Sequence, residues 1–118
     1  NQASPMHEMS LAESALQIIE QAAVANNLRR VSKVRLEIGQ LMAVEPQSLR
    51  CCLELVARGS LADGAELEIT EIPASGWCEQ CAIRIPMLEI IAACPQCGNG
   101  RLQPSDGMGM RVTTLEGW

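Results

Sequence analysis

Four cysteines occur as two pairs, each with two residues between its cysteines. The first pair is Cys78 with Cys81, and the second is Cys94 with Cys97. A turn of this length directs both sulfurs of a pair toward one centre, so two pairs complete a tetrahedron of thiolates about 2.3 Å from a zinc ion. Such a site has no open coordination position, and its expected role is therefore structural.

Other uses of the paired cysteines stay open at this point. An iron–sulfur cluster takes the same thiolate ligands, and a single pair could form a reversible disulfide as in thioredoxin-like proteins. The doubling of the pair favours zinc over a redox role. Two further cysteines are adjacent in the sequence: Cys52 falls on the apolar face of an expected helix and is interpreted as core, whereas the role of Cys51 is left open.

The only histidine is His7, which lies between Met6 and Glu8 near the start of the chain. One interpretation is a solvated side chain that flanks the first helix. The other is a metal ligand, because an imidazole with its own and adjacent deprotonated backbone amides forms a square-planar nitrogen set that suits Ni(II) or Cu(II). The chemistry of the residue alone leaves both interpretations open.

Composition narrows the classes of function. The chain of 118 residues has a formal net charge of −5 and an aromatic content of 2%. Nucleic acid is a poor partner for it, because the charge has the wrong sign for phosphate and aromatic stacking groups are scarce. No run of roughly 18 apolar residues and no export signal is evident. We therefore expect a cytoplasmic protein that has no membrane partner and keeps its cysteines reduced.

The first two predicted elements are a helix and a strand. Ser10 and Glu13 have the spacing of a capping box, so the helix is predicted to begin at Ser10 and to end before Asn26. From Val31 to Gly39 the apolar residues alternate, which predicts a half-buried strand. The apolar face predicted for the helix comprises Leu11, Ala15, Ile18, Ile19 and Ala22.

The later elements repeat this order. A second helix is predicted to begin at Pro46, with Glu45 at its N-terminus. Alternation predicts a strand that includes Leu67 and ends at Pro73, and a further strand from Met108 to Leu115. Between them, over residues 74–106, both periodicities vanish and the four paired cysteines occur. The pattern predicts an α+β fold: a small mixed sheet with two helices on one face, plus an inserted zinc-ribbon-like lobe.

These motifs together resemble the HypA/HybF family of hydrogenase-maturation nickel metallochaperones. The resemblance extends from Met6 to the end of the chain, and the Met-His-Glu opening is its specific element, since zinc knuckles occur in many unrelated proteins. The matching segments are Met6-His7-Glu8-Met9-Ser10-Leu11, Ile38-Gly39, Gly59-Ser60 with Gly64, and the two cysteine pairs at their spacing.

The resemblance implies a nickel site and a zinc site. Nickel would bind to the Met6-His7-Glu8 segment through the His7 side chain and neighbouring backbone nitrogens, and some family members place an acidic residue nearby at the position of Glu45. The zinc ligands would be Cys78, Cys81, Cys94 and Cys97. One departure is that five residues precede Met6, so its nitrogen is a peptide amide and not the α-amine that the family can use.

The sequence therefore predicts a nickel carrier and not an enzyme. It has neither an evident Ser/His/Asp or Cys/His arrangement nor a phosphate-binding loop. A site made of one imidazole and flexible terminal backbone could release its ion by ligand exchange without unfolding a core. The resemblance implies that the GTPase HypB is a partner and that the large subunit of a [NiFe] hydrogenase receives the nickel.

The expected domain organisation follows from these assignments. Residues 1–5 are interpreted as a leader or added segment, residues 6–73 with 107–118 as an α/β nickel-binding domain, and residues 74–106 as a zinc-binding domain. Two alternatives remain: a zinc-ribbon protein-interaction module without nickel transfer, and a thiol redox protein.

Overall fold

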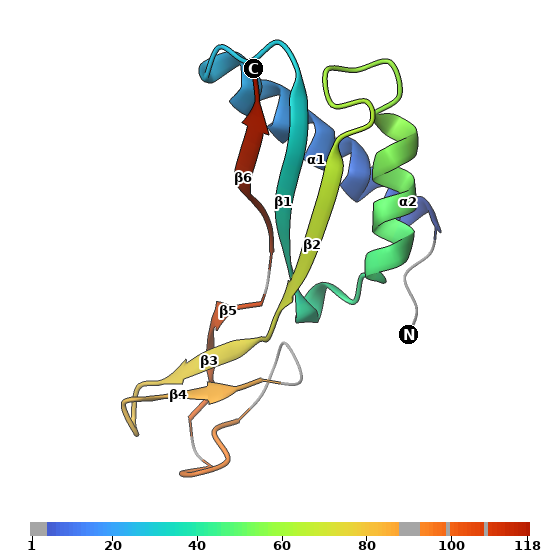
Figure 1. Ribbon diagram of the computed structural model, residues 1–118. Coiled ribbons are helices and arrows are strands. Elements are labelled where there is room, and N and C mark those ends of the chain that lie inside the picture. Colours follow the sequence, from blue (N-terminus) through green and yellow to red (C-terminus); the bar gives the residue numbers. More distant parts are fainter. Residues whose placement is uncertain (1–4, 88–92, 99, 108) are drawn as a thin grey trace. The chain divides into compact units, whose positions relative to one another are not determined.

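The computed structural model describes residues 5–87, 93–98, 100–107 and 109–118 (Figure 1). The order of the described helices and strands matches the predicted order from the first helix to the second strand. They are α1 (Pro5–Ala25), β1 (Val31–Gly39), a 3-10 turn (Gln40–Met42), α2 (Pro46–Val56), β2 (Glu66–Ile72), β3 (Ser75–Cys78), β4 (Ile83–Pro86), β5 (Gln103–Asp106) and β6 (Met110–Gly117).

The chain divides into two compact units. Unit 1 comprises Asn1–Glu37, Ala43–Thr70 and Arg111–Trp118, and unit 2 comprises Ile38–Met42 and Glu71–Met110. Unit 2 therefore includes the last two residues of β1 and the 3-10 turn that follows it, in addition to the region that holds the paired cysteines.

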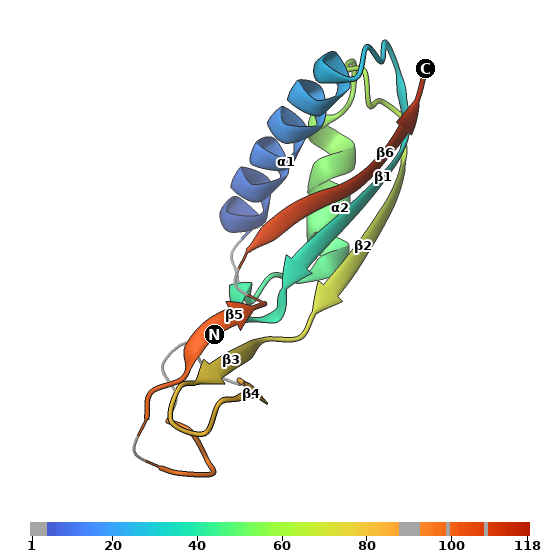
Figure 2. The same ribbon diagram turned by 90° about the vertical axis from the view of Figure 1, so that its left-hand side faces the viewer.

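Unit 1 is built on a three-stranded sheet with the strand order β2-β1-β6. In Figure 2 the arrows of β1 and β2 point the same way and that of β6 points the opposite way, so the sheet is mixed. Both helices cover the same face of it (Figures 1 and 2). The predicted α+β architecture with two helices on one face is confirmed.

The core of unit 1 lies between this sheet and its helices. Val34 and Leu36 of β1 are buried, as are Leu49 and Leu53 of α2, so the period-two and period-three-to-four patterns do mark the inward faces. The opposite face of the sheet carries charged side chains. Lys33 lies 3.1 Å from Glu68, and this hydrogen bond lowers the pKa of the Glu68 carboxyl. Other ion pairs on this face include Arg35–Glu68 at 2.8 Å and Arg111–Glu37 at 3.0 Å.

The first helix begins earlier than predicted. It starts at Pro5, so Ser10 and Glu13 lie inside it and the predicted capping box is wrong. Proline is well suited to the first position of a helix because its fixed φ matches and its missing N–H is not needed there. The acidic Glu8 in the first turn adds a favourable interaction with the helix dipole. The proline at position 5 therefore marks the start of this helix better than the capping-box spacing of Ser10 and Glu13 does.

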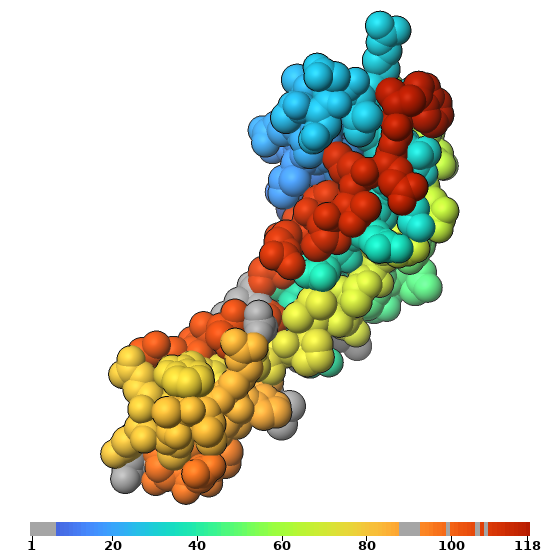
Figure 3. All heavy atoms as spheres, turned by 60° about the vertical axis from the view of Figure 1, so that its left-hand side comes forward, coloured from blue at the N-terminus to red at the C-terminus, as the bar shows by residue number. Residues whose placement is uncertain are grey.

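The buried face of α1 is also rotated from the predicted one. Its most buried residues are Ala12, Ala15, Ile19 and Ala23, whereas Ile18 is 39% exposed. Ile18 borders a groove between α1 and β6, which lie side by side in Figure 3. Alanines on the inward face let the helix approach its neighbours closely, so the larger Ile18 was a misleading marker of the core.

Unit 2 contains a second three-stranded sheet, with the order β4-β3-β5 and antiparallel pairing throughout. The sequence periodicity over residues 74–106 gave no sign of these strands. Each of these strands has only four residues, which is too short for alternation to be recognised in the sequence. At Gly76 on β3, a Cβ atom would lie 2.5 Å from Met87 Sδ, so a glycine is needed for this packing.

The last strand runs from Met110 to Gly117, which agrees with the prediction within two residues at either end. Met108, where that prediction began, lies outside the described residues. Within the described part of the chain, neither helix combines the length and the apolar character that spanning a membrane would need.

Candidate functional site

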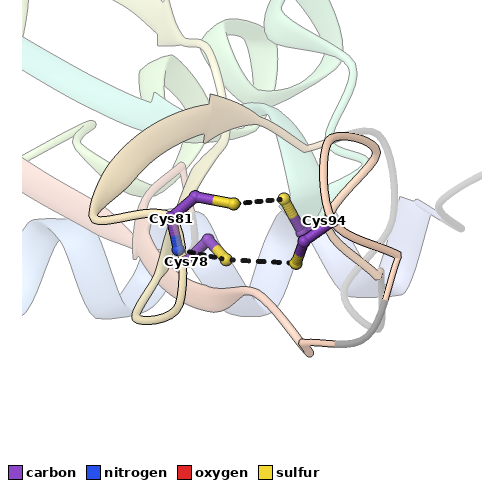
Figure 4. Close-up of side chains that lie close together, drawn as sticks. Cys78, Cys81 and Cys94 are labelled. Carbon is purple, nitrogen blue, oxygen red and sulfur yellow. Dashed lines mark hydrogen bonds between the residues drawn. The ribbon is translucent and has the colours of Figure 1, made fainter.

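The four predicted zinc ligands of unit 2 come together in space. The sulfur atoms of Cys78, Cys81, Cys94 and Cys97 all lie within 4.8 Å of one another. The Cys78 and Cys97 sulfurs are 3.8 Å apart, and those of Cys81 and Cys94 are 3.9 Å apart. In Figure 4 the sulfurs of Cys81 and Cys94 point toward each other. A tetrahedron of thiolates around zinc has sulfur–sulfur edges of about 3.8 Å, so these two separations fit a zinc site.

Two turns of the same design hold the sulfurs. Cys78 ends β3, and its carbonyl oxygen accepts a hydrogen bond of 2.7 Å from the N–H of Ala82. The Cys94 carbonyl accepts an equivalent bond of 2.8 Å from the N–H of Gly98. Ala82 and Gly98 both have positive φ, at 56° and 71°, so each turn reverses the chain four residues after its first cysteine. The N–H of Cys81 also points at the Cys78 sulfur, at 3.4 Å.

Burial controls the chemistry of these thiols. Cys78 and Cys94 are buried, and Cys81 and Cys97 are half-buried. Burial, followed by hydrogen bonding with the neighbouring cysteines, raises the pKa of the Cys81 thiol to about 12. A divalent cation would reverse the balance, because it binds the thiolate directly.

The predicted nickel residues lie in unit 1. His7 is exposed and sits in the first turn of α1, so the prediction that it lies ahead of the first helix is wrong. Glu8, the next residue, is buried with 3% exposure. Successive residues of an α-helix point about 100° apart, which explains why these two neighbours face such different surroundings.

Glu45 lies where the sequence predicted, at the N-cap of α2 with Pro46 as the first helical residue. Its carboxylate accepts hydrogen bonds from the backbone N–H of Ser48 at 2.9 Å and of Gln47 at 3.3 Å. The Ser48 bond, followed by the Gln47 bond, lowers the pKa of the Glu45 carboxyl. This carboxylate therefore caps the start of α2, beyond any part it has in binding a metal.

One contact of this region was not predicted. The backbone N–H of Glu45 donates to Glu8 Oε2 at 3.1 Å, joining residues 37 positions apart. No sequence pattern predicts this contact, because the two groups become neighbours only when α1 and α2 pack together. Elsewhere in unit 1, Cys51 is exposed and Cys52 is half-buried on α2, and neither belongs to the sulfur cluster.

Comparison with known proteins decides the family. Residues 6–117 match the family described as "Hydrogenase/urease nickel incorporation, metallochaperone, hypA". The chain belongs to the HypA family. The resemblance inferred from the Met-His-Glu opening and the cysteine pairs is thus confirmed.

Relatives in this family match nearly the whole chain. The hydrogenase maturation factor HypA of Dechloromonas aromatica is 50% identical over 111 residues, which is 94% of this chain and 98% of the relative. The HypA of Azotobacter vinelandii has the same identity and coverage.

Solved structures of the family share the fold. The solution structure of the Ni metallochaperone HypA from Helicobacter pylori has a TM-score of 0.72 and 23% sequence identity, covering 93% of this chain and 96% of that one. A second solution structure of a HypA protein has a TM-score of 0.70 and 24% identity, covering 98% of both chains. At these identities the agreement concerns the fold.

Removing the N-cap carboxylate tests its role in unit 1. We expect Glu45→Ala to lower the midpoint of thermal unfolding by a few degrees near neutral pH, with Glu45→Gln between it and the unchanged protein, because the amide keeps one acceptor. A lowered carboxyl pKa stabilises the fold above the unfolded-state pKa, and this contribution is lost as pH falls through the folded-state value. The difference between the unchanged protein and Glu45→Ala should therefore shrink in acid.

The measurement is thermal unfolding followed by far-ultraviolet circular dichroism over a pH series. Glu54→Ala is the control, because Glu54 is an exposed carboxylate near the other end of α2. Equal unfolding midpoints for Glu45→Ala and the unchanged protein at every pH would mean that the cap does not stabilise α2.

Proposed function

We propose that this chain is a nickel carrier that binds Ni(II) at the Met6-His7-Glu8 segment, through the His7 imidazole and neighbouring backbone nitrogens. The observation that carries the proposal is the match of residues 6–117 to a family described by nickel incorporation. The exposure of His7 in the first turn of α1 supports it, because a cargo ion must be reached by the protein that receives it. Glu45 is a further candidate nickel ligand, because its backbone N–H is hydrogen-bonded to Glu8.

The four clustered cysteines of unit 2 are proposed to hold a resident zinc ion. The sulfur separations of 3.8 and 3.9 Å support zinc, because they are close to the edges of a tetrathiolate site. Zinc at a closed sulfur site would act as a structural cross-link between the two turns. This division gives unit 1 the transferred metal and unit 2 the permanent one.

The proposed recipient is the large subunit of a [NiFe] hydrogenase, with the GTPase HypB as the partner that supplies nucleotide hydrolysis. The names of the relatives, which are hydrogenase maturation factors, support this assignment. The chain itself would act as a carrier and not as a catalyst, in the cytoplasm, and without a nucleic acid or a membrane as partner. An exposed site of one imidazole and backbone nitrogens suits handover, since its ligands can be exchanged singly.

The delivery step can be tested with purified components. The chain is loaded with nickel and mixed with an immature hydrogenase large subunit, HypB, GTP and a chelator in excess that traps free nickel. We expect nickel to appear in the large subunit while zinc stays with the carrier. Nickel supplied as the free ion under the same conditions is the control. Equal incorporation from the free ion and from the loaded chain would rule out delivery by this protein.

A further inference from the structure

Glu8 is the one buried charged side chain among the described residues, with 3% exposure. It belongs to the first turn of α1, one residue after the exposed His7. Burying a carboxylate is costly unless hydrogen bonds replace its water. The environment of Glu8 must therefore supply those bonds, and any function of the carboxylate has to be compatible with them.

The partner of the Glu8 carboxylate is the start of α2. Its Oε2 atom accepts the backbone N–H of Glu45 at 3.1 Å. In a capping box this N–H is normally bound by a Glu or Gln at the third helical position. In α2 that position is Ser48, whose N–H and hydroxyl are directed to the Glu45 carboxylate. Glu8 thus completes from α1 a capping arrangement that α2 lacks within its own sequence.

The electrostatics of α2 favour this arrangement. A helix N-terminus carries a partial positive charge, and carboxylates are stabilised there. Two of them, from Glu45 and Glu8, meet the N–H groups at the start of α2. If Glu8 Oε2 bound a metal ion instead, the carboxylate would lose its hydrogen bond from the Glu45 N–H.

We infer that the Glu8 side chain is a positioning group and not a nickel ligand. By holding the first turn of α1 against the start of α2, it fixes the direction in which the His7 imidazole and the adjacent backbone nitrogens are presented. The inference rests on the proposed nickel-carrier function. It gives the Glu8 carboxylate a positioning role and leaves the Glu8 backbone nitrogen as a proposed nickel ligand.

Two substitutions at Glu8 separate positioning from ligation. Glu8→Gln keeps the length and an oxygen acceptor but removes the anionic ligand. Glu8→Asp keeps the carboxylate but shortens its reach by one methylene. Positioning predicts nickel affinity within about threefold of the unchanged protein for Glu8→Gln, whose oxygen still reaches the Glu45 N–H. It predicts a loss of at least about tenfold for Glu8→Asp, as expected when this hydrogen bond is broken. Ligation predicts the reverse order.

The affinities are measured by competition with a chromophoric chelator, and Glu13→Gln is the matched control because Glu13 is an exposed carboxylate on the same helix. Hydrogen exchange of the Glu45 amide gives a second readout that needs no nickel. We expect protection in the unchanged protein and in Glu8→Gln, and faster exchange in Glu8→Asp.

The two readouts distinguish the possible failures. Faster Glu45 exchange in Glu8→Asp with unchanged nickel affinity would mean that the bond stabilises the fold without orienting the site, and would overturn the inference. The same would follow if Glu8→Asp bound nickel more tightly than Glu8→Gln. If the unchanged protein bound no nickel, the carrier proposal itself would fail, while the exchange data would still report on the bond.

Discussion

Replacing Cys94 with serine is expected to unfold unit 2 while unit 1 stays folded. Among the described residues, the hydrophobic core cluster around the sulfurs of unit 2 is small, and two of its six buried members are themselves proposed zinc ligands. These members are Ala74, Cys78, Ile85, Met87, Cys94 and Leu102. Segments with so little buried apolar surface usually need a metal or disulfide for stability. Structural zinc sites supply about 10–16 kcal/mol in small peptides, and a hydroxyl is a poor substitute for a thiolate.

The two tryptophans make this expectation measurable in each unit separately. They are the only aromatic residues of the chain, with Trp77 in unit 2 and Trp118 in unit 1. In a Trp118→Phe background, fluorescence reports on unit 2 alone, and in a Trp77→Phe background it reports on unit 1. We expect Cys94→Ser to give the Trp77 emission of an unfolded chain without denaturant, while Trp118 still shows a cooperative unfolding transition.

Cys51→Ser is the matched control, because Cys51 is an exposed thiol outside the sulfur cluster. It should leave both fluorescence signals unchanged. A strong zinc chelator should reproduce the effect of Cys94→Ser in the otherwise unchanged protein. A cooperative Trp77 transition that survives both Cys94→Ser and the chelator would show that packing alone holds unit 2.

The sequence predicted unit 1 well where a helix or strand is long enough for its hydrophobic pattern to repeat. The nine residues of β1 contain several alternations, and α2 combines a proline at its first position with an apolar stripe. Both patterns arise because one face of each element must be buried. The start of α1 was missed because Pro5 was set aside with the residues before it, although proline often begins a helix.

Unit 2 and the sites were predictable to different degrees. The sulfur cluster follows from spacing because each CxxC turn is a local structure that brings its own two sulfurs together. The short strands β3, β4 and β5 carry no readable period, and they form through pairing between segments such as Ser75–Cys78 and Ile83–Pro86. The contact between Glu8 and Glu45 was beyond prediction, because it depends on the packing of two helices.

Replacing His7 with alanine is expected to weaken nickel binding by at least about a hundredfold. Changing a group that merely orients a metal ligand costs about 10–100-fold in affinity, and the proposed site would lose a ligand itself. No other imidazole exists in the chain to replace it. The zinc content should not change, because the sulfur cluster of unit 2 uses no histidine. Nickel is measured by chelator competition, and zinc by elemental analysis of the same samples.

The pattern of metal loss identifies the cause. Loss of nickel alone in His7→Ala supports a carrier whose cargo and resident metals bind to different donors. Ser10→Ala, at an exposed position one turn further along α1, controls for effects of substitution on the helix. Unchanged nickel binding in His7→Ala would favour the zinc-ribbon interaction module, because the Met6-His7-Glu8 segment would then be an ordinary helix start. Joint loss of both metals would contradict the separation of the two sites, since a nitrogen-based site and a sulfur cluster share no ligand.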